Sequence, residues 1–321
     1  MKMQANTPEI SIVMPAFNEA ESLFATVTDV AGRLAEHHYE IVIVDDGSKD
    51  GTWQVINDLA NSNARIRGLK FSRNFGHQSA LLAGLSAARG SAVITLDSDG
   101  QHPPELIPAL LAEWQQGAVI VQTLRQDPKT QGVFKRSTSK AYYRVFSWLA
   151  DTPISPGSAD FRLLDRRAVD VILKHPRSAM FLRGFVPWTG FRTAYIKFHP
   201  KERTAGETKY SLTRMLNLAK QGIMRFSLKP LRLATLLGSI TCFSALAYLG
   251  YVVYTRLFGG HYTEGWASLA GLLALLGGLQ LLIMGILGEY IGMIFEAEQS
   301  RPHFIVEDDT GAGRGHSSNT M

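Results

Sequence analysis

The sequence predicts an α/β protein with a mostly parallel sheet and helices on both faces, followed by a hairpin of two membrane helices. Short apolar runs such as Tyr39–Val44 alternate with helical patterns in the first half of the chain, and this predicts the sheet. Strands that are buried on both faces of a parallel sheet have this apolar character. Two long uncharged stretches, 233–255 and 267–288, predict the hairpin.

The expected strands bring polar residues to one edge of the sheet. Apolar runs predict strands at 10–14, 39–44, 66–71, 91–96 and 119–121, with helical patterns at 20–37, 53–60, 78–88 and 106–114. In parallel sheets, ligands bind at the carboxyl ends of the strands. The first, second and fourth strands are followed by Phe17-Asn18-Glu19, Asp45-Asp46 and Asp97-Ser98-Asp99. We expect these three clusters to meet.

The segment from Asp97 to Gln101 is the main candidate for a metal site. Two carboxylates that lie one residue apart at the end of a buried strand are costly unless positive charge separates them. A divalent cation that also binds a diphosphate would supply this charge, and an acidic turn that caps the next helix is the structural alternative. A Ca²⁺ loop is excluded because Pro108 stands where it needs Glu. His77 and His102 are weaker metal candidates, since a histidine beside a turn is usually structural.

Charge and cysteine content indicate the environment. The net charge is +5, and the segment from Lys201 to Arg232 alone has eight Lys or Arg against two Glu. This surplus precedes the first uncharged stretch, which indicates anionic lipid headgroups and no nucleic acid. The single cysteine, Cys242, excludes a disulfide framework and fits a reducing compartment. No signal peptide is recognisable, so we expect the N-terminal part in the cytosol.

Four parts are predicted along the chain: a cytosolic α/β domain (1–210), a juxtamembrane amphipathic helix (211–232), two transmembrane helices (233–295) and a cytosolic tail (296–321). Basic and aromatic residues between Arg125 and Trp148 predict another interfacial helix, with a solvated helix as the alternative. The positive-inside bias places both chain ends in the cytosol. The glycine-containing tail from Glu307 is predicted to be disordered; a dinucleotide-binding loop is the alternative, and it is disfavoured because no strand precedes the glycines.

Several motifs together resemble family-2 glycosyltransferases of the GT-A fold. They are Val13–Glu19, Val44–Ser48, Ser72–Gly76 and Asp97–Pro103, extended by Asp160-Phe161-Arg162, the loop 203–209 and the terminal helix pair. The chain is most similar to the polyprenyl-phosphate branch, which includes dolichol-phosphate mannose synthase and bactoprenol (undecaprenyl-phosphate) glucosyltransferases. Phe17 stands where this family often has Tyr, and Gly100 where it often has a larger residue.

The resemblance implies a role for each group of residues. Nucleotide-sugar binding is implied for Pro15, Phe17, Asn18, Glu19, Asp46, Ser72, Asn74 and Asp97. Mg²⁺ or Mn²⁺ would be bound by Asp97, Asp99 and Gln101. The catalytic candidates are Asp160, Asp97 and Asp99, where Asp160 is either a base or a partner of Arg162 that shapes the site. The lipid phosphate would be bound by Arg125, Arg136, Ser139, Arg203 and Lys209.

The implied reaction is an inverting transfer of one sugar from a nucleotide sugar, UDP-glucose or another UDP-hexose, to a polyprenyl phosphate such as undecaprenyl phosphate. It would take place at the cytoplasmic face of the inner membrane and serve cell-envelope glycans such as lipopolysaccharide. Membrane lipids are further partners, and a homo-oligomer is left open. One alternative is a processive polysaccharide synthase, although the Gln-x-x-Arg-Trp motif is absent around Gln221. The other is a non-catalytic nucleotide-sugar-binding membrane protein.

Overall fold

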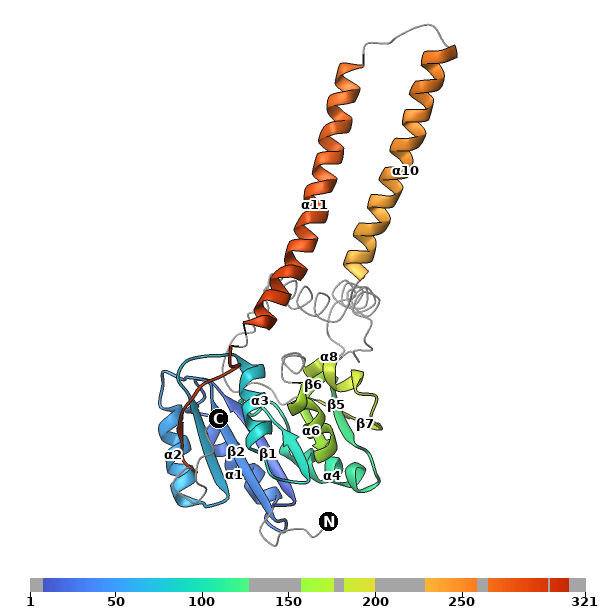
Figure 1. Cartoon of the computed structure of the whole chain (residues 1–321). Helices are drawn as coiled ribbons and strands as arrows, with labels where there is room; N and C mark the ends of the chain where they lie inside the picture. The colour runs from blue at the N-terminus through green and yellow to red at the C-terminus, as the bar shows by residue number, and fades with distance from the viewer. Residues whose placement is uncertain are drawn as a thin grey trace. The chain divides into compact units, whose positions relative to one another are not determined.

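The computed structural model describes residues 8–126, 157–175, 182–199, 229–258, 265–299 and 301–311. The chain divides into two compact units (Figure 1). The first comprises 1–144, 152–211 and 302–321 and is the α/β unit, and the second comprises 145–151 and 212–301 and contains the two long helices. Each unit is described by itself.

The α/β unit is built around one sheet, which has eight strands in the described part of the chain, in the order β7-β5-β6-β4-β1-β2-β3-β8. The strands are β1 (Ile10–Ala16), β2 (Tyr39–Asp45), β3 (Ile66–Phe71), β4 (Ala92–Thr95), β5 (Ile120–Arg125), β6 (Ser158–Asp165), β7 (Thr193–Phe198) and β8 (Val306–Asp309). β1 is parallel to β2 and β4, and β2 is parallel to β3. The predicted parallel half of the sheet is therefore confirmed.

The other half of the sheet is mixed. β6 is antiparallel to both β4 and β5, and β5 is parallel to β7. Neither β6 nor β7 is among the strands predicted from the sequence. The pairing of β4 with β6 places Arg162 opposite Thr95 and so brings Asp160 close to the carboxyl end of β4.

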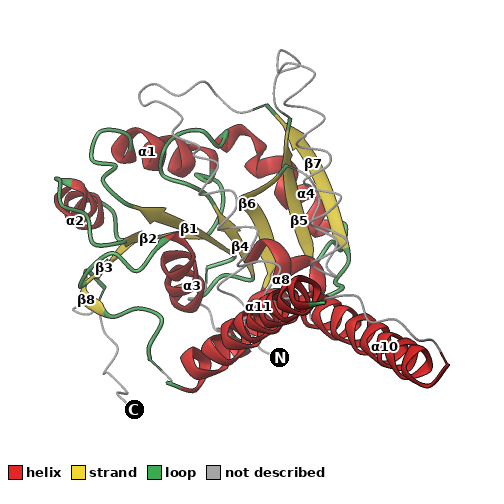
Figure 2. Cartoon of the chain, turned by 90° about the horizontal axis from the view of Figure 1, so that it is seen from above, coloured by secondary structure: helices red, strands yellow, loops and turns green. Residues whose placement is uncertain are grey.

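Helices cover both faces of the sheet, as predicted (Figure 2). They are α1 (Leu23–Arg33), α2 (Thr52–Ser62), α3 (His77–Ala87), the short η1 (Pro104–Leu106), α4 (Ile107–Gln115), α6 (Arg166–Lys174) and α8 (Leu182–Trp188). Ile41 and Ile43 of β2 lie in one apolar cluster with residues of α1, α2 and α4. Val42 and Val44 lie in another with Ala80 of α3. Successive side chains of a strand point to opposite faces, so one strand supplies both cores.

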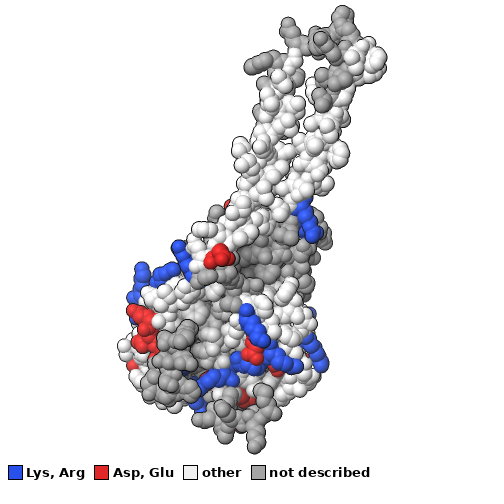
Figure 3. Space-filling model, viewed as in Figure 1, with Lys and Arg blue, Asp and Glu red and all other residues white. Residues whose placement is uncertain are grey.

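The second unit contains two long helices, α10 (Lys229–Phe258) and α11 (Trp266–Glu298). Segments Leu231–Tyr248 and Gly271–Phe295 are long and apolar enough to cross a membrane. Large apolar side chains such as Phe243 and Leu281 are exposed on them, and the hairpin surface in Figure 3 carries no charge over most of its length. The predicted pair of helices is confirmed, whereas residues 211–228 of the juxtamembrane helix and 127–148 of the interfacial segment lie outside the described residues.

The prediction of disorder from Glu307 onward is wrong for residues 307–311. Glu307 and Asp309 belong to β8, which pairs antiparallel with β3. Lys70 of β3 contacts Glu307 at 2.9 Å, and Arg67 contacts Asp309 at 2.5 Å. These opposite charges across the two strands stabilise a segment whose acidic sequence gives little local strand signal. The segment from Pro302 therefore belongs to the α/β unit.

Candidate active site

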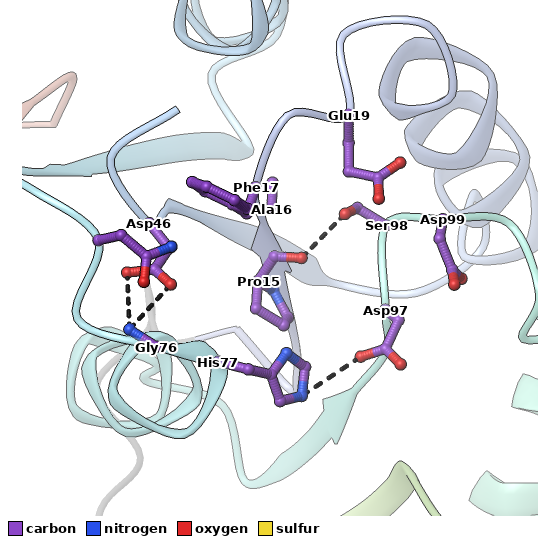
Figure 4. A pocket seen from close by; sticks show the side chains of 11 residues that line it. Pro15, Ala16, Phe17, Glu19, Asp46, Gly76, His77, Asp97, Ser98 and Asp99 are labelled. Carbon is purple, nitrogen blue, oxygen red and sulfur yellow. Dashed lines mark hydrogen bonds and ion pairs between the residues drawn. The ribbon is translucent and has the colours of Figure 1, made fainter. Parts of the chain in front are cut away.

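A pocket lies at the carboxyl ends of β1, β2 and β4 (Figure 4). Its volume is about 320 Å³. The three polar clusters at these strand ends contribute to its wall, together with residues that follow β3. The lining residues are Pro15, Ala16, Phe17, Glu19, Asp46, Asn74, Gly76, His77, Asp97, Ser98 and Asp99. The structure thus brings together side chains that the expected strand order placed at one edge.

Asp97 has a carboxylate oxygen with no hydrogen-bond partner. Its Oδ1 atom is buried and without a hydrogen bond among the described residues, and the Nε2 atom of His77 lies 3.6 Å from it. Burial raises the pKa of Asp97, and the charges of Asp160 and Asp99 add to this shift while His102 and His77 oppose it. A carboxylate in this position is stabilised by an added positive charge.

Asp97 and Asp99 fit a divalent cation whose coordination is completed by a substrate. Among the described residues, no three His, Cys, Asp or Glu side chains form a group able to hold a metal by themselves. Mg²⁺ is usually bound by one or two carboxylates together with substrate phosphates. The unpartnered oxygen of Asp97 and the adjacent Asp99 agree with this pattern.

Gln101 and His102 hold the acidic loop in place. The Gln101 side-chain nitrogen donates to Asp99 Oδ2 at 2.7 Å, and Arg125 Nη1 donates to Gln101 Oε1 at 3.5 Å. The Asp97 backbone N–H donates to His102 Nδ1 at 3.0 Å, and the buried His102 ring stacks on Phe161. Because Nδ1 accepts this hydrogen bond, it is not available to a metal, and this contact agrees with the structural interpretation of His102.

Asp160 is a buried carboxylate between two guanidinium groups. Arg162 contacts its Oδ1 at 2.5 Å, and Arg183 of α8 contacts its Oδ2 at 2.8 Å. Burial raises the pKa of Asp160, but the charge of Arg183, the contact with His77 and the charge of Arg162 outweigh burial and hold its pKa well below the usual range. A carboxylate whose pKa lies far below neutral is a weak general base. The structure therefore favours the shaping role over the base role.

His77 lies between the two acidic positions at the start of α3. Its Nε2 is 3.5 Å from Asp160 Oδ2 and 3.6 Å from Asp97 Oδ1. Burial lowers the pKa of His77, but the contact with Asp160 and the charge of Asp97 outweigh burial and raise its pKa above the ordinary value. Arg183, Asp160, His77 and Asp97 thus form a row in which basic and acidic side chains alternate. Sequence analysis missed Arg183 and assigned His77 no such role.

Asp46 fixes the loop that follows β3. Its carboxylate accepts the N–H groups of Phe75 at 2.7 Å and of Gly76 at 3.0 Å. Gly47, at φ +70°, lies against the same loop, since a Cβ there would be 2.4 Å from the carbonyl carbon of Arg73. Only glycine adopts this backbone conformation readily and leaves room for the loop. Asn74 is thereby held at the pocket wall.

The remaining predicted residues separate into three groups. Phe17 is 43% exposed and presents its ring to the pocket. Asn18 and Ser72 do not line the pocket: Asn18 accepts the Lys49 N–H at 2.9 Å, and the Ser72 N–H donates to the Ile305 carbonyl at 3.1 Å. The predicted lipid-phosphate residues Arg136, Ser139, Arg203 and Lys209 lie outside the described residues.

The α/β sheet of GT-A type, the acidic pocket at its carboxyl edge and the apolar helical hairpin define a membrane-associated transferase. The family model "Glycosyl transferase family 2" matches residues 11–184, and the model "GtrB C-terminal hairpin" matches residues 229–294. The chain belongs to glycosyl transferase family 2. The resemblance that the motifs predicted is therefore confirmed, and the protein is a glycosyltransferase.

Similar proteins cover nearly the whole chain. It is 38% identical to "Uncharacterized glycosyltransferase YkcC" of Bacillus subtilis over 94% of both chains. It is 37% identical to "Prophage bactoprenol glucosyl transferase homolog" of Escherichia coli over 93% of this chain and 98% of that one. It is 38% identical to "Bactoprenol glucosyl transferase" of Shigella phage SfV, over 94% and 99%. A solved glucosyl-3-phosphoglycerate synthase from Mycobacterium tuberculosis is 21% identical over 68% and 78%, with a TM-score of 0.45.

Proposed function

We propose that the protein transfers one glucose residue from UDP-glucose to a polyprenyl phosphate such as undecaprenyl phosphate, with inversion at the anomeric carbon. The observation that carries the proposal is the buried, unpartnered Oδ1 of Asp97 beside Asp99 in the pocket. A site that lacks one positive charge is suited to a cation and a diphosphate together. The names of the relatives from E. coli and phage SfV support the choice of glucose and lipid.

The donor would lie across the pocket. Pro15, Phe17, Glu19, Asp46 and Asn74 would surround the nucleoside, while Asn18 and Ser72 act through the loops that they fix. Asp97 and Asp99, with Gln101 holding Asp99, would bind Mg²⁺ or Mn²⁺ on the diphosphate. When bound, the ion supplies positive charge to the leaving nucleotide.

The acceptor would attack without a strong protein base. The second pKa of a phosphomonoester is about 6, so a lipid phosphate carries its own oxyanion near neutral pH. This agrees with an Asp160 carboxylate that is occupied by Arg162 and Arg183. We assign Asp160 a positioning role. Arg125, which reaches Gln101 beside Asp99, would bind the acceptor phosphate together with Arg136, Ser139, Arg203 and Lys209.

The hairpin would cross the cytoplasmic membrane twice. The basic residues before α10 and the single Arg256 between the two spans support cytosolic termini and a cytosolic catalytic domain. The lipid tail of the acceptor would then stay in the bilayer while its phosphate reaches the pocket.

The test is a donor screen with the full-length protein in detergent. Radiolabelled UDP-glucose, other UDP-hexoses and GDP-mannose are each incubated with undecaprenyl phosphate and a divalent cation, and labelled lipid is extracted. We expect one labelled hexose per lipid with UDP-glucose, and none without lipid phosphate. Polymer formation would indicate a processive synthase, and donor binding without transfer would indicate a non-catalytic binding protein. Either result contradicts the proposal.

A further inference from the structure

The C-terminal segment 304–310 returns to the outer edge of the catalytic sheet, beside β3 (Figure 2). One end of this segment is attached by polar contacts. Arg67 Nε and Nη2 donate to the Asp309 carboxylate at 2.9 and 2.5 Å. The Gly68 N–H donates to Thr310 Oγ1 at 2.8 Å, and the Thr310 N–H donates to the Gly68 carbonyl at 3.0 Å. These contacts all lie in the first part of β3.

The other end of the segment contacts the loop that leaves β3. The Phe304 ring stacks on Phe71, the last residue of β3, with 5.2 Å between centroids and 11° between planes. The Ser72 N–H donates to the Ile305 carbonyl at 3.1 Å. These contacts extend beyond the ladder of β3 and β8, because Ser72 is the first residue of the loop 72–76.

The loop 72–76 is part of the pocket wall, with Asn74 and Gly76 among the lining residues. Phe71 packs edge-on against Phe75 at 5.7 Å, and the Phe75 N–H donates to Asp46. The loop is therefore held by Asp46 on the pocket side and by the C-terminal segment on the outer side. Rows of packed rings transmit a displacement, since protein interiors have few voids to absorb it.

We propose that the C-terminal segment is a positioning element for donor binding, in which Phe304 and Ile305 fix the loop 72–76 and thereby Asn74 at the pocket. The identity of the donor rests on the proposed function, whereas the bracing of the loop does not. If the segment only covered the edge of β3, the backbone pairing of β8 with β3 and the ion pairs of Lys70 and Arg67 would be sufficient. The ring stack and the Ser72 bond add contacts directed at the pocket wall.

The experiment compares three variants of the full-length protein in detergent. Phe304→Ala removes the ring, Phe304→Tyr keeps it, and Asp309→Asn is the matched control because it weakens the attachment to Arg67 far from the loop. Two quantities are measured: hydrogen exchange at the amides of Ser72, Phe75 and Gly76, and the KM for the nucleotide sugar at saturating acceptor. The hydrogen-exchange measurement needs no ligand.

We expect Phe304→Ala to speed exchange at the three loop amides and to raise the donor KM about fivefold or more, with little change in kcat. Phe304→Tyr should restore both values, and Asp309→Asn should lower the unfolding midpoint without changing the donor KM. Unchanged loop exchange in Phe304→Ala would overturn the proposal. Equal rises in KM for Phe304→Ala and Asp309→Asn would also overturn it, since the segment would then act only through stability. If the wild-type protein does not bind the donor, the proposed function is refuted. Hydrogen exchange at the loop amides would still test whether the C-terminal segment holds the loop in place.

Discussion

Replacing Asp160 with asparagine distinguishes a structural ion pair from a catalytic base. The substitution keeps the shape of the side chain and removes its charge. Arg162, which is 1% exposed, would then be a buried cation without its anionic partner. Its Nη1 atom already lacks a hydrogen bond among the described residues, so the contact with Asp160 is its main compensation. Loss of that charge is therefore expected to destabilise the fold.

The size of the effect follows from the two contacts. Removing one partner of a buried ion pair costs about 3–5 kcal/mol. The Arg183 side chain is 40% exposed, so its contact with Asp160 is screened and contributes about 0.2–1 kcal/mol. Asp160→Asn should therefore lower the free energy of unfolding by about 3–5 kcal/mol, and Arg183→Ala by no more than about 1 kcal/mol. The folded pKa of Asp160 is depressed, so this stabilisation is present above the unfolded pKa and is lost only as pH falls through the lower folded value.

The assay is denaturant unfolding of the full-length protein in detergent at neutral pH, with transfer activity measured on the same samples. Asp160→Asn combined with Arg162→Met removes both charges and should recover much of the lost stability, because well-packed apolar residues often replace a buried pair at little cost. This reasoning is refuted if the single variant Asp160→Asn unfolds at the same denaturant concentration as the wild type but has lost transfer activity. Asp160 would then act in the chemistry and not in the ion pair.

Three further predictions concern the metal, the C-terminal strand and the topology. Asp99→Asn should lower turnover at least about a hundredfold with an unchanged unfolding midpoint, and a chelator should inactivate the parent; near wild-type activity in either test contradicts the metal site. Burial raises the pKa of Asp309, but its bond with Arg67 outweighs burial and lowers that pKa. The end of β8 at Asp309 should therefore be firmly attached above about pH 4 and should loosen as pH falls through the lower folded value, while the rest of the strand stays paired. Hydrogen exchange in β8 against pH measures this, and Asp309→Asn should remove the dependence. A membrane-impermeant thiol reagent should leave Cys242 unlabelled in intact cells and label a cysteine introduced at Tyr262; the reverse pattern would contradict the topology.

The parallel half of the fold was predictable because its signals are local. β1 and β2 are buried along their whole length, and such strands are continuously apolar in the sequence. β6 carries Asp160 and Arg162, two charges that neutralise each other in the interior, so its sequence does not look like a buried strand. β8 is mostly acidic and depends on Arg67, which lies 242 residues away from Asp309. A local sequence pattern does not indicate a partner at this distance along the chain.

The site, like the fold, was predictable only where its signals are local in the sequence. Asp97 and Asp99 follow a strand that the apolar pattern identifies, and their spacing allows a cation site or an acidic turn; the polar clusters after the other strands favour the cation site. His77 looked like an isolated histidine because the residue that gives it a role, Asp160, comes from β6. Arg183 lies on α8, and its relation to Asp160 appears only when the sheet is assembled. Sequence motifs therefore identified the acidic residues and Arg162, and the folded structure showed that His77 and Arg183 lie beside these acids.

The acids Asp160 and Asp97 have opposite surroundings, and this difference supports the different roles that we propose for them. Both Asp160 oxygens are occupied: Oδ1 accepts from Arg162 and Arg183, and Oδ2 accepts from Arg183 and lies beside His77. A carboxylate whose two oxygens are held by guanidinium groups is poorly suited to remove a proton from a substrate. Asp97 keeps one buried oxygen without a hydrogen bond and has a raised pKa. Of these two acids, Asp97 therefore provides a place for positive charge, and neither is suited to act as a strong base. Such a site suits a reaction in which the leaving group needs an electrophilic partner and the nucleophile arrives already charged, as a phosphate acceptor does.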